Sequence, residues 1–230
     1  MSNWCMNAIL ISGTSEDVSV LYKSLKEYYD AEVKSKEKEP DEGRVNIGAW
    51  IEAKFSDKLP EFTEEDYKLS YRNFIVNFKY TVDDDQAYLV INSESEYVSR
   101  MYALVKLIEI GFQKCIIHYK SEEPVMEYYI NTDESGKYFP ERWYYTNRFK
   151  SYYYMNYMSD EDMSRTLIND YVDIIKDNNM VTPSLDNPGQ DQICKLVESL
   201  VEYDESLCVY QYSIGSEYDD KNVEILKGII

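Results

Sequence analysis

The sequence predicts an α+β protein: a ferredoxin-like antiparallel sheet with two helices on one face, plus a C-terminal helical and aromatic extension. Apolar and polar residues alternate over residues 74–82, which indicates a strand with one wet face. Apolar residues recur at steps of three and four over residues 15–29 and 97–112, which indicates helices with one apolar face. The order strand, helix, hairpin, helix, strand is that of a ferredoxin-like unit.

The N-terminal strand and helix are specified by their local sequence. Residues 7–12 have apolar side chains on both faces, which is typical of a central strand. Thr14 and Asp17 then form a capping signal for a helix. Residues 32–43 are charged and poor in apolar side chains, so we expect an exposed loop there. The apolar stripe of the helix consists of Val18, Leu21, Leu25 and Tyr28.

The middle of the chain predicts a β-hairpin. Residues 49–55 suit a short strand, and the strand at 74–82 is followed by an apolar strand at 87–91. The triple aspartate at 83–85 forms the turn between these last two strands. We interpret it as a solvated turn and not as a metal site, because no spaced oxygen ligands or turn glycines surround it.

The second helix of the predicted unit covers residues 97–112. Ser93 and Glu96 form a candidate capping box at its start, and Gly111 suits a left-handed C-terminal cap. An apolar strand at 115–119 follows. The apolar face of the helix consists of Val98, Met101, Val105, Ile108 and Phe112.

We place the domain boundary after residue 137, so that residues 1–137 form the ferredoxin-like domain and residues 138–230 an accessory tyrosine-rich α+β subdomain. A further strand at 125–131 and a turn at 133–136 close the first domain.

The second part of the chain is rich in tyrosine and predicts two helices and a strand. Residues 138–157 are dominated by aromatic side chains. Ser159 caps one predicted helix, Asn187 with Pro188 starts another, and residues 207–214 suit a last strand.

Charge and composition restrict the function. With 24 basic and 43 acidic residues the net charge is −19, and such a surface repels nucleic acid, whose binding depends on basic side chains. The sequence shows no membrane span and no secretion signal, so we expect a cytoplasmic protein. The cysteines include no C-x-x-C pair, and we expect them reduced, without structural zinc.

The N-terminus carries a family resemblance. Residues 2–7 read Ser-Asn-Trp-Cys-Met-Asn and are followed by Ile9, Ile11, Ser12 and Gly13. This segment resembles the start of the YubB-like family of ferredoxin-fold proteins carried by phages and plasmids. The resemblance covers about residues 1–135 and implies a mobile-element origin and a ferredoxin-like core. The family brings no established reaction and no catalytic residues.

We interpret the acidic, tyrosine-rich surface as a site for a basic protein. Tyrosines suit the centre of an interface, and carboxylates attract and orient a basic partner. The predicted function is therefore non-catalytic: inhibition of a basic host defence protein, a nuclease or nucleic-acid sensor, by nucleic-acid mimicry in the host cytoplasm, without direct nucleic-acid binding. The candidate contact residues are Tyr144, Tyr145, Tyr152, Tyr153, Tyr154, Glu202, Asp204, Glu205, Glu217, Asp219 and Asp220.

Two alternatives stay open. The chain sequesters a small signalling nucleotide if Arg142, Arg148 and Lys150, which lie among aromatic residues, form a basic pocket. It is a nucleotide-directed hydrolase if His118, its single histidine, acts as a base. The sequence contains no phosphate-binding glycine loop and no zinc-ligand spacing, so we expect neither a cofactor nor a metal.

Overall fold

The computed structural model describes residues 4–36, 44–123, 128–147, 156–204 and 207–214. These residues form two compact units, one within Met1–Thr132 and the other within Asp133–Ile214. The division lies near the boundary that the sequence predicts after residue 137. Among the described residues, no helix is long and apolar enough to cross a membrane.

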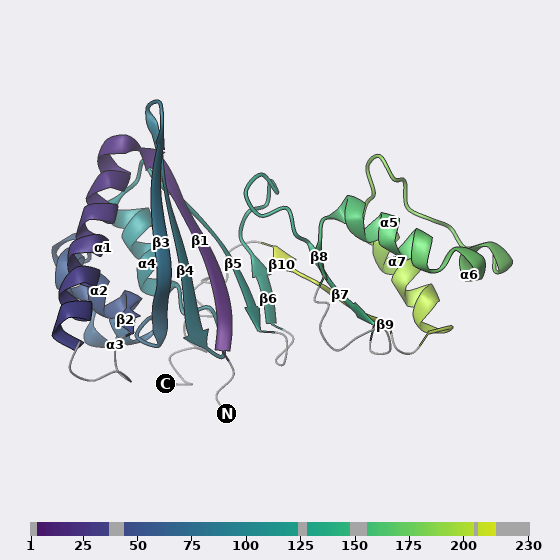
Figure 1. Cartoon of the computed structure of the whole chain (residues 1–230), viewed down its shortest axis with the longest axis horizontal. Helices are drawn as coiled ribbons and strands as arrows, with labels where there is room; N and C mark the ends of the chain where they lie inside the picture. Colours follow the sequence, from purple (N-terminus) through teal and green to yellow (C-terminus); the bar gives the residue numbers. More distant parts are fainter. Residues whose placement is uncertain (1–3, 37–43, 124–127, 148–155, 205–206, 215–230) are drawn as a thin grey trace. The chain divides into compact units, whose positions relative to one another are not determined.

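The first unit is a sheet covered by helices, which confirms the α+β class. Six strands lie in the order β6-β5-β1-β4-β3-β2, with every neighbouring pair antiparallel. In Figure 1, α1, α2 and α4 lie on the same side of this sheet, and all three contribute to one apolar core. The strands are β1 (Trp4–Thr14), β2 (Val45–Asn46), β3 (Asn73–Asp83), β4 (Gln86–Glu96), β5 (Ile116–Glu123) and β6 (Tyr128–Asn131). The helices are α1 (Ser15–Lys36), α2 (Ile47–Phe55), a 3-10 turn (Ser56–Lys58), α3 (Glu64–Lys68), α4 (Tyr102–Lys106) and a π-helical turn (Leu107–Gly111).

The predicted start of α1 is confirmed, but its predicted end is wrong. Thr14 Oγ1 accepts a hydrogen bond from the Asp17 backbone N–H at 3.3 Å and donates one to the Asp17 carboxylate at 3.0 Å. The helix continues to Lys36, so residues 32–36 are helical and not a loop. Three of these five residues, Glu32, Lys34 and Lys36, are good helix formers, and their charge does not prevent a helix. Residues 37–43 lie outside the described residues.

Residues 49–55 belong to helix α2, so the predicted strand is wrong. Asn46 caps this helix by accepting a hydrogen bond from the Ala49 N–H at 2.9 Å. Trp50 is completely buried, and its indole N–H donates to Ser24 on α1 at 3.0 Å. The buried residues of α2 recur at helical spacing. A window of seven residues is too short to distinguish this pattern from the alternation of a strand.

The second predicted helix is shorter than expected. Strand β4 extends to Glu96, and Ser93 is a buried strand residue with 1% exposure, so the predicted capping box is wrong. The chain reaches α4 through left-handed backbone conformations at Tyr97 (φ 66°) and Arg100 (φ 49°). The helix ends in a π-helical turn, and its C-cap Phe112 has φ −139°, so the left-handed cap at Gly111 is also wrong. The predicted apolar face is nevertheless buried at Met101, Val105, Ile108 and Phe112.

A bulge in β3 changes which side chains face the helices. The pairing of β3 with β4 shifts between Ile75 and Asn77. Ile75 is therefore buried, Val76 is exposed, and the uninterrupted alternation predicted from Phe74 to Val82 is wrong. The predicted hairpin with its acidic turn is confirmed, with Asp83 paired to Gln86.

The second unit has its own small sheet and core. Its strands lie in the order β8-β7-β9, and both neighbouring pairs are antiparallel. Ser159 caps α5 as predicted, whereas α7 starts after Gly189 and so slightly later than Asn187 and Pro188 suggest. The elements are β7 (Trp143–Asn147), β8 (Asn156–Met158), α5 (Asp160–Asp170), α6 (Val172–Asp177), α7 (Gln190–Val201), β9 (Leu207–Gln211) and β10 (Ser213–Ile214). The core contains Trp143, Tyr145, Met163, Leu167, Tyr171, Ile175, Ile193, Leu196, Leu200 and Leu207.

We expect the Val105→Asp variant to lose about 3 kcal/mol of unfolding free energy, because it places an unpaired carboxylate among the core residues of α4. Urea denaturation measures this loss. The control is Val20→Asp, which makes the same change at a residue of α1 that is 43% exposed. Equal stability of the two variants would contradict the placement of Val105 in the core.

Candidate functional site

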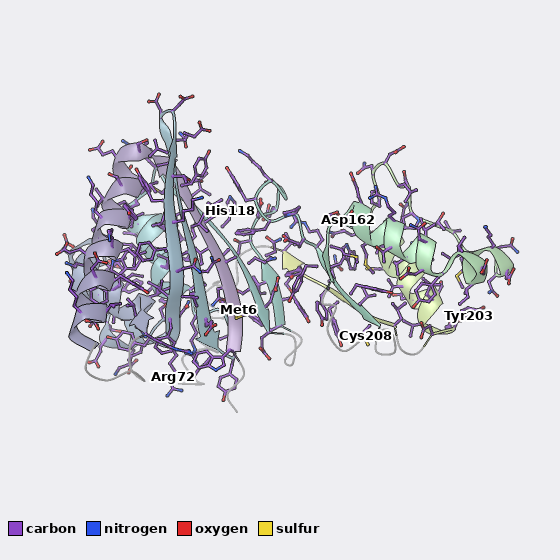
Figure 2. The ribbon with its side chains drawn as sticks, viewed as in Figure 1. Met6, Arg72, His118, Asp162, Tyr203 and Cys208 are labelled. Carbon is purple, nitrogen blue, oxygen red and sulfur yellow. The ribbon has the colours of Figure 1, made fainter. Side chains whose placement is uncertain are left out.

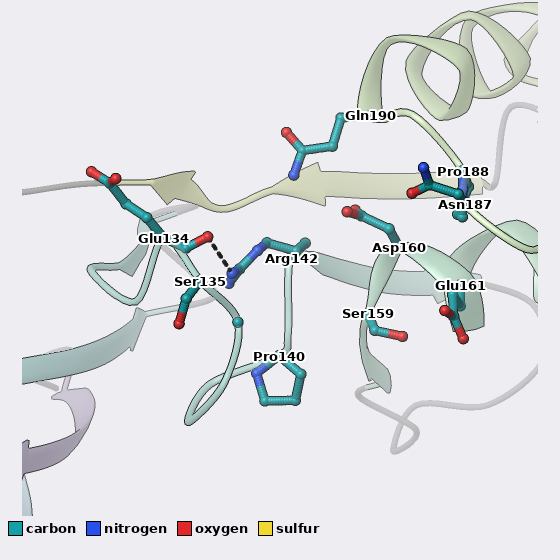
Figure 3. A pocket seen from close by; sticks show the side chains of 11 residues that line it. Glu134, Ser135, Pro140, Arg142, Ser159, Asp160, Glu161, Asn187, Pro188 and Gln190 are labelled. Carbon is teal, nitrogen blue, oxygen red and sulfur yellow. Dashed lines mark hydrogen bonds between the residues drawn. The ribbon is translucent and has the colours of Figure 1, made fainter.

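The second unit contains a polar pocket of about 500 Å³. Figure 3 shows it between the loop after Asp133, the start of α5 and the segment before α7. Its lining contains three acidic residues, Glu134, Asp160 and Glu161, and one basic residue, Arg142. The remaining lining residues are Ser135, Gly136, Pro140, Ser159, Asn187, Pro188 and Gln190.

One wall of the pocket is a loop organised by the buried Asp133. The carboxylate of Asp133 accepts hydrogen bonds from the backbone N–H groups of Tyr138 at 2.6 Å and Phe139 at 2.9 Å. It also accepts one from the Ser135 hydroxyl at 2.6 Å. Because these donors come from both sides of the turn, the Asp133 side chain fixes the path of the loop.

Arg142 holds the same loop from the opposite end. Its Nη2 donates to the carbonyls of Asp133 at 2.7 Å and Glu134 at 3.4 Å, the second of which is drawn in Figure 3. Its Nη1 donates to the carbonyls of Phe139 at 2.9 Å and Glu141 at 3.2 Å. Both terminal nitrogens thus point at backbone carbonyls, which leaves the guanidinium poorly placed to bind a phosphate.

Gly136 allows this close arrangement. Its φ is +69°, and a Cβ atom at this position would lie 2.9 Å from Arg142 Nη2. A side chain at residue 136 would therefore meet both backbone strain and the bound guanidinium.

The other wall is the start of α5. Ser159 caps the helix by accepting the Asp162 N–H at 3.2 Å. The Asp160 carboxylate accepts the Trp143 indole N–H at 2.6 Å, which ties the helix to strand β7. Glu161 is exposed, as is Glu134 across the pocket. The pocket therefore presents carboxylate and carbonyl oxygens, which attract cationic groups.

The described tyrosines predicted to contact a partner are interior residues. Tyr144 and Tyr145 are 7% and 5% exposed, so their rings are not available as a contact surface. Tyr144 lies beside the rings of Tyr157 and Tyr210, with centroids 5.6 and 5.9 Å away. Their burial argues against a contact role, because Tyr145 belongs to the core of this unit and Tyr144 packs against other tyrosines.

The predicted acidic residues separate into two groups. Asp204 accepts a hydrogen bond from the Tyr171 hydroxyl at 2.7 Å and so supports the packing of α5. Glu202 is exposed at the end of α7. The other predicted contact residues, Tyr152, Tyr153, Tyr154, Glu205, Glu217, Asp219 and Asp220, lie outside the described residues, as do Arg148 and Lys150.

The structure of this unit shifts the pKa of the Tyr145 hydroxyl. Its hydroxyl donates to the Asp170 carboxylate at 3.1 Å. Burial, followed by the nearby Asp170 charge, raises the pKa of Tyr145 to about 12 from its ordinary 10.

His118 lies on β5 in the first unit (Figure 2). It pairs with Leu10 on β1, and its side chain is on the sheet face opposite to Ile117 and Tyr119. The four cysteines form no disulfide. Within the described ranges, no cluster of three or more histidine, cysteine, aspartate or glutamate residues is arranged to hold a metal ion.

A second pocket, of about 520 Å³, lies in the first unit. The rings of Phe62 and Tyr102 stack at its side with a centroid distance of 5.6 Å. Sequence reasoning missed both pockets, because each is built from segments that are distant in the chain and carry no shared motif. The lining residues of the second pocket are Leu59, Pro60, Glu61, Phe62, Asp66, Tyr102, Lys106 and Ile110.

No protein-family model, curated protein or solved structure matches this chain. The resemblance of residues 2–13 to the YubB-like family therefore stays a prediction.

We expect stability to fall as pH rises from 10 to 12, in part through Tyr145. The folded state holds the proton of this hydroxyl more tightly than the unfolded state, so its contribution is complete below pH 10 and is lost as the pH approaches 12. Urea denaturation in this pH range should show a shallower decline for Tyr145→Phe than for the wild type. Tyr203→Phe, at an exposed tyrosine, is the control and should keep the wild-type slope. Identical slopes for Tyr145→Phe and the wild type would contradict this role.

Proposed function

We propose that this chain is a non-catalytic acidic protein that binds and inhibits a basic, nucleic-acid-binding host protein. The observation that carries the proposal is the polar pocket of the second unit, whose lining contains three acidic residues and an arginine that is already bound to backbone carbonyls. Such a pocket suits an arginine or lysine side chain of a partner. The net charge of −19 adds long-range attraction for a basic surface.

The rival proposal, sequestration of a signalling nucleotide, has less support. It requires cationic donors that are available to a phosphate. Arg142, the described member of the proposed basic cluster, uses both terminal nitrogens on backbone carbonyls. Moving a phosphate into a pocket of three carboxylates also meets like-charge repulsion.

For the first unit we propose a ferredoxin-like arrangement. The order β5-β1-β4-β3, with antiparallel neighbours and α1 and α4 on one face, supports it. Together with the N-terminal resemblance, this arrangement supports a phage or plasmid origin and an anti-defence role in the host cytoplasm.

The partner proposal is tested by affinity capture from host cells at low and high salt. The captured protein should be basic and should be displaced by its own nucleic acid, and its association rate should fall steeply as ionic strength rises. Charge reversal of the acidic residues in 198–224 other than Asp204, which holds Tyr171, tests the C-terminal segment separately: recovery of the same partner by this variant would exclude the segment as the contact surface.

A matched pair of variants tests the pocket itself. Glu134→Gln with Glu161→Gln removes two exposed pocket carboxylates without touching Asp160, which holds Trp143. We expect this double variant to bind the captured partner about tenfold more weakly. Asp173→Asn with Asp177→Asn removes the same charge from exposed positions on α6 and should change binding little. If both double variants bound the partner equally weakly, general charge attraction would explain the binding and the pocket would have no specific role. If neither variant bound the partner more weakly than the wild type, the proposal would be overturned.

A third test addresses catalysis. His118→Gln should retain full inhibitory activity in a host-protection assay, because we assign no proton transfer to this half-buried strand residue. Circular dichroism checks that the variant is folded. A folded His118→Gln protein without activity would favour the hydrolase alternative.

A further inference from the structure

One edge of the sheet in the first unit is open over most of strand β3. Strand β2, the last in the order, pairs with β3 only through Val45 with Ile75 and Asn46 with Phe74. In the part of the chain that the structure describes, no strand pairs with the outer side of β3 from Val76 to Asp83. Figure 1 shows β3 running beyond β2 to the tip of its hairpin with β4.

Several side chains along this edge are exposed. Val76 and Val82 are 48% and 53% exposed, and Lys79, Thr81 and Asp83 are exposed between and beyond them. An unpaired strand presents backbone N–H and C=O groups that can bond to another strand. The pairing with β2 stops at Ile75, and β3 pairs with β4 in regular register from Asn77 to Asp83, so a regular strand follows the part that β2 covers.

We propose that this edge pairs with the same edge of a second copy of the chain, antiparallel and centred on Thr81. Two copies related by a two-fold axis present the same surface to each other. With the axis at Thr81, Lys79 of each copy lies opposite Asp83 of the other. One interface thus contains two cross-strand pairs of opposite charge.

The other symmetric registers lack this complementarity. In an antiparallel ladder, two opposed residues both direct their backbone N–H and C=O groups toward the partner strand or both direct them away from it. In a symmetric pair, the two-fold axis must therefore pass at one residue, which then lies opposite its own copy, and not between two residues. An axis at Lys79 opposes two lysines, and an axis at Tyr80 places Lys79 opposite Thr81. An axis at Val82 places Asp83 opposite Thr81, and it places Lys79 opposite Asp85, which lies in the turn beyond the end of β3. Only the Thr81 register pairs Lys79 with Asp83.

The same register also matches the two faces of the sheet. Lys79, Thr81 and Asp83 pair with Val90, Tyr88 and Gln86 on β4, and so all lie on one face. On the other face, Tyr80 of one copy lies opposite Val82 of the other, and the exposed valine gains an aromatic neighbour. Tyr80 is held in place by stacking on Tyr22 of α1, with ring centroids 4.7 Å apart. The interface is a single strand pair, so we expect a weak dimer.

Analytical ultracentrifugation of the full chain, across a protein concentration series, tests the proposal. The wild type should form dimers at high concentration. Lys79→Asp and Asp83→Lys should each weaken the dimer about tenfold or more, because each places like charges in both cross-strand pairs. The double variant with both changes restores opposite charges and should dimerise within about threefold of the wild type.

The controls separate the register from net charge. Lys195→Asp makes the same charge change at an exposed residue of α7 in the second unit and should leave dimerisation unchanged. Circular dichroism checks that each variant is folded, which we expect because residues 79 and 83 are exposed. A wild type that stays monomeric, a double variant that remains as weak as the single ones, or an equal effect of Lys195→Asp would each overturn the proposal.

Discussion

The first unit depends on the burial of strand β1 between two other strands. Ile9 and Ile11 are completely buried, and β1 pairs with β4 on one side and β5 on the other. Because both edges of β1 are used, its backbone hydrogen bonds need no further partner, and the helices have one fixed apolar face to cover. The faces of α1, α2 and α4 meet on that surface in one core. A polar change at Ile9 or Ile11 would therefore affect every element of the unit.

A row of buried polar groups marks the end of this apolar surface. The Asn7 side chain donates to the carbonyls of Cys5 at 3.3 Å and Ser93 at 3.4 Å and to the Ser95 hydroxyl at 3.0 Å. Ser95 in turn donates to the carbonyl of Val98. These bonds connect β1 and β4 to the left-handed segment before α4, where such contacts offset the cost of the unusual backbone. Asn7 and Cys5, which belong to the N-terminal motif, thus have a structural role in this unit.

The sequence predicted elements whose signals are local and missed those that depend on distant contacts. The Thr14 and Ser159 caps and the acidic hairpin turn need only neighbouring residues, and all three are correct. Residues 49–55 form a helix in part because Trp50 packs against α1, a contact that no short window reveals, whereas the Asn46 cap is a local signal that the prediction overlooked. The Ser93 box failed because Ser93 is opposite Asn7, 86 residues away in the chain.

The difference between local signals and distant contacts also explains why the sequence did not reveal the candidate site. Net charge and tyrosine content are visible in the sequence, but the pocket requires Arg142, the loop after Asp133 and the start of α5 to come together. Composition alone also overestimates how many acidic and aromatic side chains are available to a partner. Tyr145 and Tyr171 donate to the carboxylates of Asp170 and Asp204, so part of the acidic and aromatic content stabilises the fold.

Hydrogen bonds within the chain also distinguish carboxylates that are already paired from those that can attract a cationic partner. A carboxylate that accepts a tyrosine or backbone hydrogen in the interior is already compensated and contributes little to attracting a partner. Asp133, with three donors on its oxygens, belongs to this group. The exposed carboxylates of Glu134 and Glu161 flank the pocket that Asp133 and Asp160 help to build. The internally paired acids Asp133 and Asp160 thus fix the geometry in which the exposed acids can act on a cation.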